Sequence, residues 1–187
     1  NDHLTNTFKQ ILIYRAMGWE IPQFAHLPLN LGKDRKKISK REGPTSVIEY
    51  KEMGFLPEAI VNFLALLGWS PGNEREIMTR DEMIELFSLE RVNPANPVFD
   101  IQKLEWMNGE YIRSLSSSEL ADRVAPVLIK AGLLDESQLT SNREWIEKAI
   151  GSLRERVRLL NDVVDLGAYY FTDKFEYDPK GTKKHFS

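Results

Sequence analysis

The sequence predicts a mainly α-helical protein with one short strand. Apolar residues recur at helical spacing in several segments of the 187-residue chain, and two segments carry the S/T-x-x-E spacing of a helix capping box. The chain has 42% hydrophobic residues and a formal net charge of -3, which suits one or two folded domains and argues against disorder.

The first element in order is an amphipathic helix over residues 3–17. Its apolar residues recur every three or four positions, and Gly18 follows at the usual place of a C′ glycine. Residues 24–32, FAHLPLNLG, are short, apolar and interrupted by a proline, which predicts a short strand. Gly32 would then turn the chain into a strongly basic loop.

Three helices are predicted between residues 57 and 113. Pro57 and Gly68 mark the two ends of the first helix. Thr79 and Glu82 have capping-box spacing at the start of the second. Asp100 can cap the third, which carries a run of apolar and aromatic residues.

The serine-rich stretch 114–120 is the clearest internal boundary. Ser116 and Glu119 repeat the capping-box spacing and predict that a new helix begins there. Beyond this point the apolar pattern stays helical. The predicted helices cover residues 117–131, 142–162 and 163–171.

Composition also excludes several classes of protein. Without cysteine there is no disulfide framework and no thiolate zinc site, and the histidines His3, His26 and His185 lack metal-ligand spacing. No apolar run approaches the length of a membrane span, and the first residues lack the layout of a signal peptide. We therefore expect a cytoplasmic protein. The absence of a starting methionine suggests a piece of a longer chain.

The basic loop carries the strongest functional signal. Residues 33–41, KDRKKISKR, hold six basic side chains and one acid, between Gly32 and Gly43. A charge run of this kind is most often a solvated surface loop. The order Lys37-Ile38-Ser39-Lys40-Arg41, however, resembles the KMSKS motif of class I aminoacyl-tRNA synthetases.

The surroundings of the loop extend this resemblance over nearly the whole chain. DHLTNTFKQILIYRAMGW, FAHLPL, KISKR, GFLPEAIVNFLALLGWSP and VFDIQKLEWMNGEYIR occur in the order typical of bacterial-type glutamyl-tRNA synthetases. The resemblance implies the end of a Rossmann-type nucleotide-binding domain with a short strand, then a helical stem-contact fold and a helical anticodon-binding domain. The implied boundaries are 1–43, 44–115 and 116–187.

The resemblance implies an ATP-dependent glutamate–tRNA ligase, present here as an incomplete fragment without activity of its own. Activating a carboxylate with ATP expels pyrophosphate, so cations placed near the departing oxygens speed the step. Lysine suits this role because its flexible point charge can follow a moving phosphate. We therefore predict Lys37 and Lys40 as catalytic and ATP-binding residues, with Ser39 and Ile38 holding the loop and the adenine. Magnesium is expected to accompany ATP, and no protein-bound zinc is expected.

Three further residues are candidate ATP contacts by resemblance. Asp2 lies where the family contacts ATP and the substrate amino group, although the arginine-glycine pair that precedes this position in the family is missing. Asp2 could equally be an ordinary helix N-cap. Leu29 and Asn30 match a segment that meets the adenine edge, and the alternative is a buried strand without a ligand.

Four arginines are candidate tRNA contacts. Arg41 is expected to be structural or to contact a tRNA phosphate, and Arg113 to bind a phosphate of the acceptor arm. Arg154 lies on a predicted helical face with Arg158, and the alternative there is a solvated helix surface. Arg156 matches an arginine that reads the third anticodon base in bacterial-type glutamate enzymes.

Rival interpretations stay open at this point. The chain could be a tRNA-binding module without catalysis, or a structural helical domain whose basic loop is incidental. A glutaminyl enzyme is disfavoured because its anticodon-binding part is a β-barrel, and a truncated tRNA-modifying paralogue because it has no such part. The expected partners are tRNA(Glu), glutamate and ATP, with no membrane, and the parent enzyme is expected to be a monomer.

Overall fold

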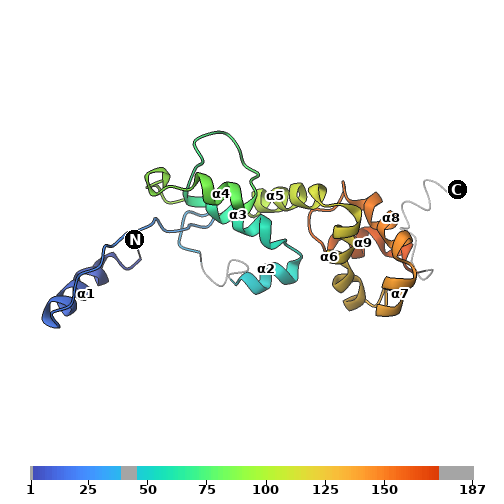
Figure 1. The fold of residues 1–187 in the computed structure, drawn as a ribbon, viewed down its shortest axis with the longest axis horizontal. Helices are drawn as coiled ribbons and strands as arrows, with labels where there is room; N and C mark the ends of the chain where they lie inside the picture. Colours follow the sequence, from blue (N-terminus) through green and yellow to red (C-terminus); the bar gives the residue numbers. More distant parts are fainter. Residues whose placement is uncertain (1, 39–45, 173–187) are drawn as a thin grey trace. The chain divides into compact units, whose positions relative to one another are not determined.

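The computed structural model describes residues 2–38 and 46–172, which form helices joined by loops (Figure 1). The helices in chain order are α1 (Leu4–Ala16), α2 (Val47–Met53), α3 (Pro57–Gly68), α4 (Arg80–Leu86), the 3₁₀ helix η1 (Leu89–Arg91), α5 (Ile101–Ser114), α6 (Ser117–Lys130), α7 (Glu136–Ser141), α8 (Arg143–Leu153), α9 (Asp162–Gly167) and the 3₁₀ helix η2 (Ala168–Tyr170). The prediction of a mainly α-helical fold is confirmed. The chain divides into two compact units: unit 1 comprises residues 1–47 and 58–104, and unit 2 comprises 48–57 and 105–187.

The predicted helix ends are largely those observed. Helix α1 is one residue shorter at each end than the prediction, and Gly18 follows it with φ 67°, the left-handed conformation that glycine adopts without cost. The Trp19 N–H donates to the Tyr14 carbonyl over 2.9 Å, which closes the end of the helix. Helix α3 runs from Pro57 to Gly68 as predicted.

Side chains cap the later helices as their spacing predicts. Thr79 and Glu82 form a complete capping box at α4, and Ser116 and Glu119 form one at α6. At α5 the Asp100 carboxylate accepts a hydrogen bond of 3.0 Å from the Gln102 N–H.

The predicted strand over residues 24–32 is wrong. Within this stretch only Leu31 takes part in β-bridges, antiparallel with Lys37 and parallel with Val98. Pro28 has no N–H to donate to a ladder, and the Leu29 N–H donates instead to the Asn96 side chain over 3.1 Å. Tertiary hydrogen bonds thus replace the pairing that a strand would need.

The predicted helix over residues 142–162 is too long, because α8 begins at Arg143 and already ends at Leu153. The Arg158 and Leu159 N–H groups both donate to the Asp162 carboxylate over 2.8 Å. The Leu160 N–H donates to the Gly54 carbonyl over 2.9 Å. In a continuous helix these N–H groups would instead donate to the carbonyls four residues earlier.

Each unit has its own buried core. In unit 1, Trp69, Met78 and Met83 are buried together against partly buried residues of α3, α4 and the segment after η1. In unit 2, α6 packs on α8 and α9, and α7 packs on α8. The largest fully buried side chains of unit 2 are Met107, Ile112, Leu120, Val124, Leu128, Ile146, Ile150, Leu153, Val157 and Val163.

Within residues 2–38 and 46–172, no helix has both the length and the apolarity that crossing a membrane requires.

Candidate functional site

The described part of the basic loop is a tight reversal of the chain. The Gly32 N–H donates to the Lys36 carbonyl over 2.8 Å, and the Arg35 N–H donates to the Gly32 carbonyl over 2.9 Å. Arg35 has φ 61°, which is uncommon for a residue with a side chain. The Asp34 carboxylate accepts from the Lys36 N–H over 2.9 Å. The basic side chains therefore project from a hydrogen-bonded turn.

The base of this turn is anchored to the segment before α5. The Leu31 N–H donates to the Pro97 carbonyl over 2.9 Å, and the Phe99 N–H donates to the Leu31 carbonyl over 2.8 Å. The Lys33 ammonium lies 3.8 Å from the Asp100 carboxylate that caps α5. The start of the basic loop is thus tied to residues 97–100, just before α5, which belong to the same unit.

The structure brings two predicted site residues together, Asp2 and Lys37. The Lys37 Nζ donates to both carboxylate oxygens of Asp2, over 3.0 and 2.9 Å. This hydrogen bond and the lysine charge hold the pKa of the Asp2 carboxyl below its ordinary value. Asp2 does not cap α1, because His3 occupies that position without a side-chain capping bond. Both partners are largely exposed, so the pair can be broken easily.

The remaining predicted ATP contacts are only partly described. Leu29 and Ile38 are half-buried, and Asn30 is exposed. The Leu29 N–H is already bonded to Asn96, which leaves its carbonyl for another partner. Ser39, Lys40 and Arg41 lie outside the described residues.

The predicted tRNA contacts of unit 2 occupy different surroundings. Arg113 is half-buried on α5 and hydrogen-bonds the Glu110 carboxylate. Arg154 donates from Nη1 to the Leu115 carbonyl over 3.0 Å, so it holds the end of α5. Arg156 is exposed in the turn that follows α8. The predicted common helical face of Arg154 and Arg158 does not exist.

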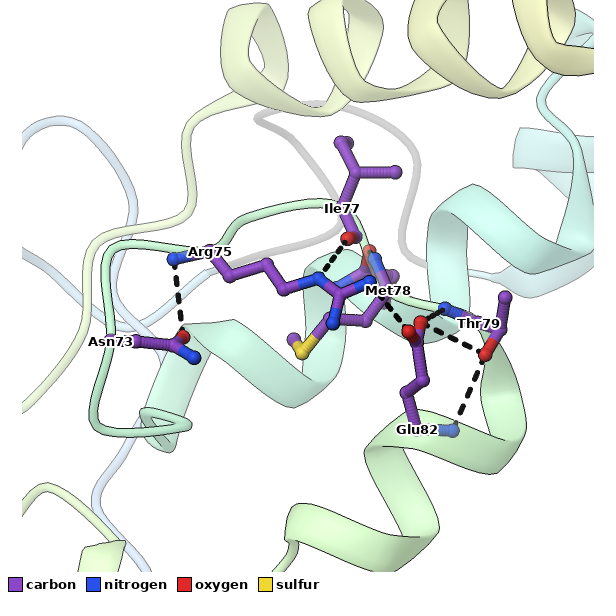
Figure 2. Close-up of polar contacts among 7 residues, drawn as sticks. Asn73, Arg75, Ile77, Met78, Thr79 and Glu82 are labelled. Atoms are coloured by element: carbon purple, nitrogen blue, oxygen red, sulfur yellow. Dashed lines mark hydrogen bonds and ion pairs between the residues drawn. The ribbon is translucent and has the colours of Figure 1, made fainter.

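A polar network between α3 and α4 was not predicted beyond its capping box (Figure 2). The Arg75 guanidinium donates to the Ile77 carbonyl over 3.3 Å and to the Glu82 carboxylate over 2.5 Å. The other Glu82 oxygen accepts from the Thr79 N–H and hydroxyl, over 2.8 and 3.0 Å. The Glu82 carboxylate therefore holds both the loop that carries Arg75 and the first turn of α4. The Thr-x-x-Glu spacing predicted the capping box between Thr79 and Glu82. No sequence pattern predicted the ion pair between Arg75 and Glu82.

The buried side-chain amide of Asn62, on α3, binds the loop that precedes α4. Its Oδ1 accepts from the Met78 N–H over 2.9 Å, so α3 holds the segment that leads into α4. Among the described residues, no group of three or more His, Asp or Glu side chains is arranged to hold a metal ion.

Two family models match the chain. One, described as tRNA synthetases class I (E and Q), catalytic domain, matches residues 1–106. The other, described as an anticodon binding domain, matches residues 119–187.

Curated relatives match the chain from end to end. It is 46% identical over 186 residues to the glutamate–tRNA ligase of Moorella thermoacetica and 48% identical to that of Thermodesulfovibrio yellowstonii. Both alignments cover 100% of this chain but 38% and 40% of the relatives. The chain therefore spans well under half of their length.

Solved structures agree with the sequence relatives. The glutamate tRNA ligase of Elizabethkingia meningosepticum, crystallised with its amino acid, matches 100% of this chain and 39% of its own. Its TM-score is 0.79 and its sequence identity 32%. The glutamate-tRNA synthetase of Elizabethkingia anophelis gives a TM-score of 0.77 at the same identity.

Proposed function

Because the chain belongs to the class I tRNA synthetases for glutamate and glutamine, we propose that it is part of a glutamate–tRNA ligase. Such an enzyme activates glutamate with ATP and transfers it to tRNA(Glu). The observation that carries the proposal is a match to glutamate–tRNA ligases over the full chain at 46% and 48% identity. The helical fold after residue 117 favours the glutamate enzyme over the glutaminyl alternative.

The basic loop supplies the chemistry that the activation step needs. The glutamate carboxylate attacks the α-phosphorus of ATP, and charge grows on the oxygens of the departing pyrophosphate as the bond between the α- and β-phosphates breaks. An ammonium group that meets those oxygens most strongly in the transition state lowers the barrier. Lys37 is exposed at the end of an anchored turn, so its side chain can reach a nucleotide once its exposed ion pair with Asp2 is broken. Lys40 is proposed for the same role by resemblance.

Asp2 gives Lys37 a counter-ion before the nucleotide arrives. Lys37 lowers the pKa of the Asp2 carboxyl, which favours the ionised form of the pair. A triphosphate carries more negative charge than one carboxylate and can displace it, since the exposed pair is weak. Asp2 would then be left to contact the substrate amino group or the nucleotide, as its position in the family implies.

The other predicted contacts stay proposals. Ile38 and Ser39 would hold the adenine and the loop, and Leu29 and Asn30 would meet the adenine edge. Arg41, Arg113, Arg154 and Arg156 would contact tRNA. The bond from Arg154 to the Leu115 carbonyl gives that arginine a structural role besides any contact with RNA.

Magnesium would enter with ATP. The basic loop has the wrong charge to bind a cation, and the described residues offer no cluster of carboxylates for one. The phosphate oxygens of the nucleotide would therefore hold the ion. The proposal further includes a cytoplasmic location and a monomeric parent enzyme, and we expect no measurable aminoacylation by the chain alone.

The Lys40→Ala variant of the full-length ligase tests the proposal. We expect adenylate formation to fall by about 100-fold or more, as for other preplaced groups that stabilise developing charge, while the tRNA Kd changes little. Glutamate-dependent exchange of pyrophosphate into ATP measures the first quantity, and filter binding measures the second. If tRNA binding falls in a salt-dependent way and adenylation does not, the chain is a tRNA-binding module.

A further inference from the structure

Two arginines that are far apart in the sequence approach the same buried glycine of α5. A Cβ atom placed on Gly109 would lie 3.3 Å from Nη1 of Arg113 and 3.7 Å from Cγ of Arg158. Arg113 is one turn further along α5, whereas Arg158 belongs to the loop after α8. The Arg113 guanidinium and the stem of Arg158 therefore lie against one small area of unit 2.

The backbone at Arg158 is fixed on both sides. Its carbonyl accepts from the buried Asn108 amide over 2.5 Å, and its N–H donates to the Asp162 carboxylate over 2.8 Å. Two residues later, the Leu160 N–H donates to the Gly54 carbonyl over 2.9 Å. The backbone at Arg158 is thus fixed before any partner binds, so binding need order only the side chain.

Two carboxylates lie beside this pair, and both already accept hydrogen bonds. Glu110 hydrogen-bonds Nη2 of Arg113, while Nη1 faces Gly109. Asp162 is engaged by the N–H groups of Arg158 and Leu159. The exposed Arg158 guanidinium makes no hydrogen bond or ion pair with any other residue in the described ranges, 2–38 and 46–172. One guanidinium is therefore available outright and a second is partly available.

We propose that Arg113 and Arg158 together bind the phosphate backbone of tRNA, an inference that rests on the proposed function for the identity of its partner. Guanidinium groups match phosphate oxygens with paired hydrogen bonds. Phosphate contacts fix the register of a nucleic acid without reading its bases. RNA is favoured over an acidic protein because the anticodon binding domain model includes Arg158.

The test compares tRNA binding by full-length ligase variants at several salt concentrations. We expect Arg158→Ala to raise the Kd for a tRNA(Glu) transcript about three- to tenfold. The slope of log Kd against log salt should fall by about 0.7–0.9, the value of one lost phosphate contact. Arg158→Lys should keep most of the slope because it keeps the charge. A transcript with an altered anticodon should show the same ratio between wild type and variant, since a phosphate contact does not read bases.

Lys130→Ala is the matched control, because it removes one exposed positive charge from α6 of the same unit. We expect it to leave the Kd and the slope unchanged. Thermal unfolding should give equal Tm for wild type and Arg158→Ala, whose backbone bonds are intact. An unchanged Kd in Arg158→Ala, or an equal loss in Lys130→Ala, would overturn the site. If the wild-type ligase charges tRNA(Glu) in the same experiment, such an outcome refutes only the arginine site. If it does not charge tRNA(Glu), the proposed function itself fails.

Discussion

At the scale of single residues, Glu82 shows how much one ionised side chain organises. It accepts from the Thr79 backbone, the Thr79 hydroxyl and the Arg75 guanidinium (Figure 2). These interactions, the Thr79 backbone bond foremost, lower the pKa of the Glu82 carboxyl below its ordinary value. The group therefore stabilises the fold where it is ionised, above the unfolded-state pKa of about 4.3.

This stabilisation should disappear as the pH falls through the lowered pKa of folded Glu82. We predict that Glu82→Gln flattens the dependence of the unfolding free energy on pH between about pH 5 and 3, because the variant has no carboxylate to protonate. Urea unfolding at a series of pH values measures this quantity. Glu85→Gln on the same helix controls for the loss of one acidic residue. If the unfolding free energy depends on pH equally in wild type and Glu82→Gln, ionisation of Glu82 does not stabilise the fold.

Single residues differ in how well the sequence predicted their roles. Capping positions such as Thr79 and Ser116 were predictable because each depends on a partner three residues away. The contact of Lys37 with Asp2 spans 35 positions, and the approach of Arg158 to Gly109 spans 49, so no local pattern encodes either one. Resemblance suggested Asp2 and Lys37 as residues of one site, but it suggested nothing about Arg158.

At the scale of elements, the segment after α8 depends on a buried amide. Asn108 on α5 accepts from the Leu56 N–H over 2.7 Å and donates to the Arg158 carbonyl over 2.5 Å. The residue is fully buried, so water cannot replace these partners. Asn108 therefore joins three segments of unit 2 that lie far apart in the sequence.

We predict that Asn108→Ala lowers the free energy of unfolding by about 2–4 kcal/mol, because it leaves a buried N–H and a buried carbonyl without partners. Denaturant unfolding monitored by circular dichroism measures the change. Asn142→Ala, at an exposed position before α8, serves as the control and should cost much less. A loss below about 0.5 kcal/mol in Asn108→Ala would mean that the junction is held by other contacts.

The same amide helps to explain why the predicted helix over 142–162 was too long. The apolar spacing continues past Leu153, and the local carboxylate of Asp162 binds only the N–H groups of Arg158 and Leu159. Distant partners, Gly54 and Asn108, bind the backbone of residues 158–160 instead. The short helices α2 and α7 were not predicted because a few residues carry too little periodicity, although Asp135 and Gln138 do form a capping box at α7.

At the scale of the whole molecule, the fold class followed from patterns that are mostly local. Helices whose ends carry their own signals, such as α3 and α6, formed as predicted. The domain boundaries 1–43, 44–115 and 116–187 stay predictions, because they came from resemblance. Helix α1 leaves Phe8, Leu12 and Ile13 more than half exposed, and under the proposed function further parts of the nucleotide-binding domain would cover them.

The central claim is that an ammonium group of the basic loop stabilises the pyrophosphate leaving group. The most direct measurement is the rate of glutamyl-adenylate formation at saturating ATP, in the full-length ligase and its Lys37→Ala variant. Lys36→Ala is the matched control, since Lys36 lies in the same turn and pairs with Asp34 at 3.4 Å. We predict a loss of about 100-fold for Lys37→Ala and no more than a few-fold loss for Lys36→Ala. Equal rates for wild type and Lys37→Ala would contradict the claim.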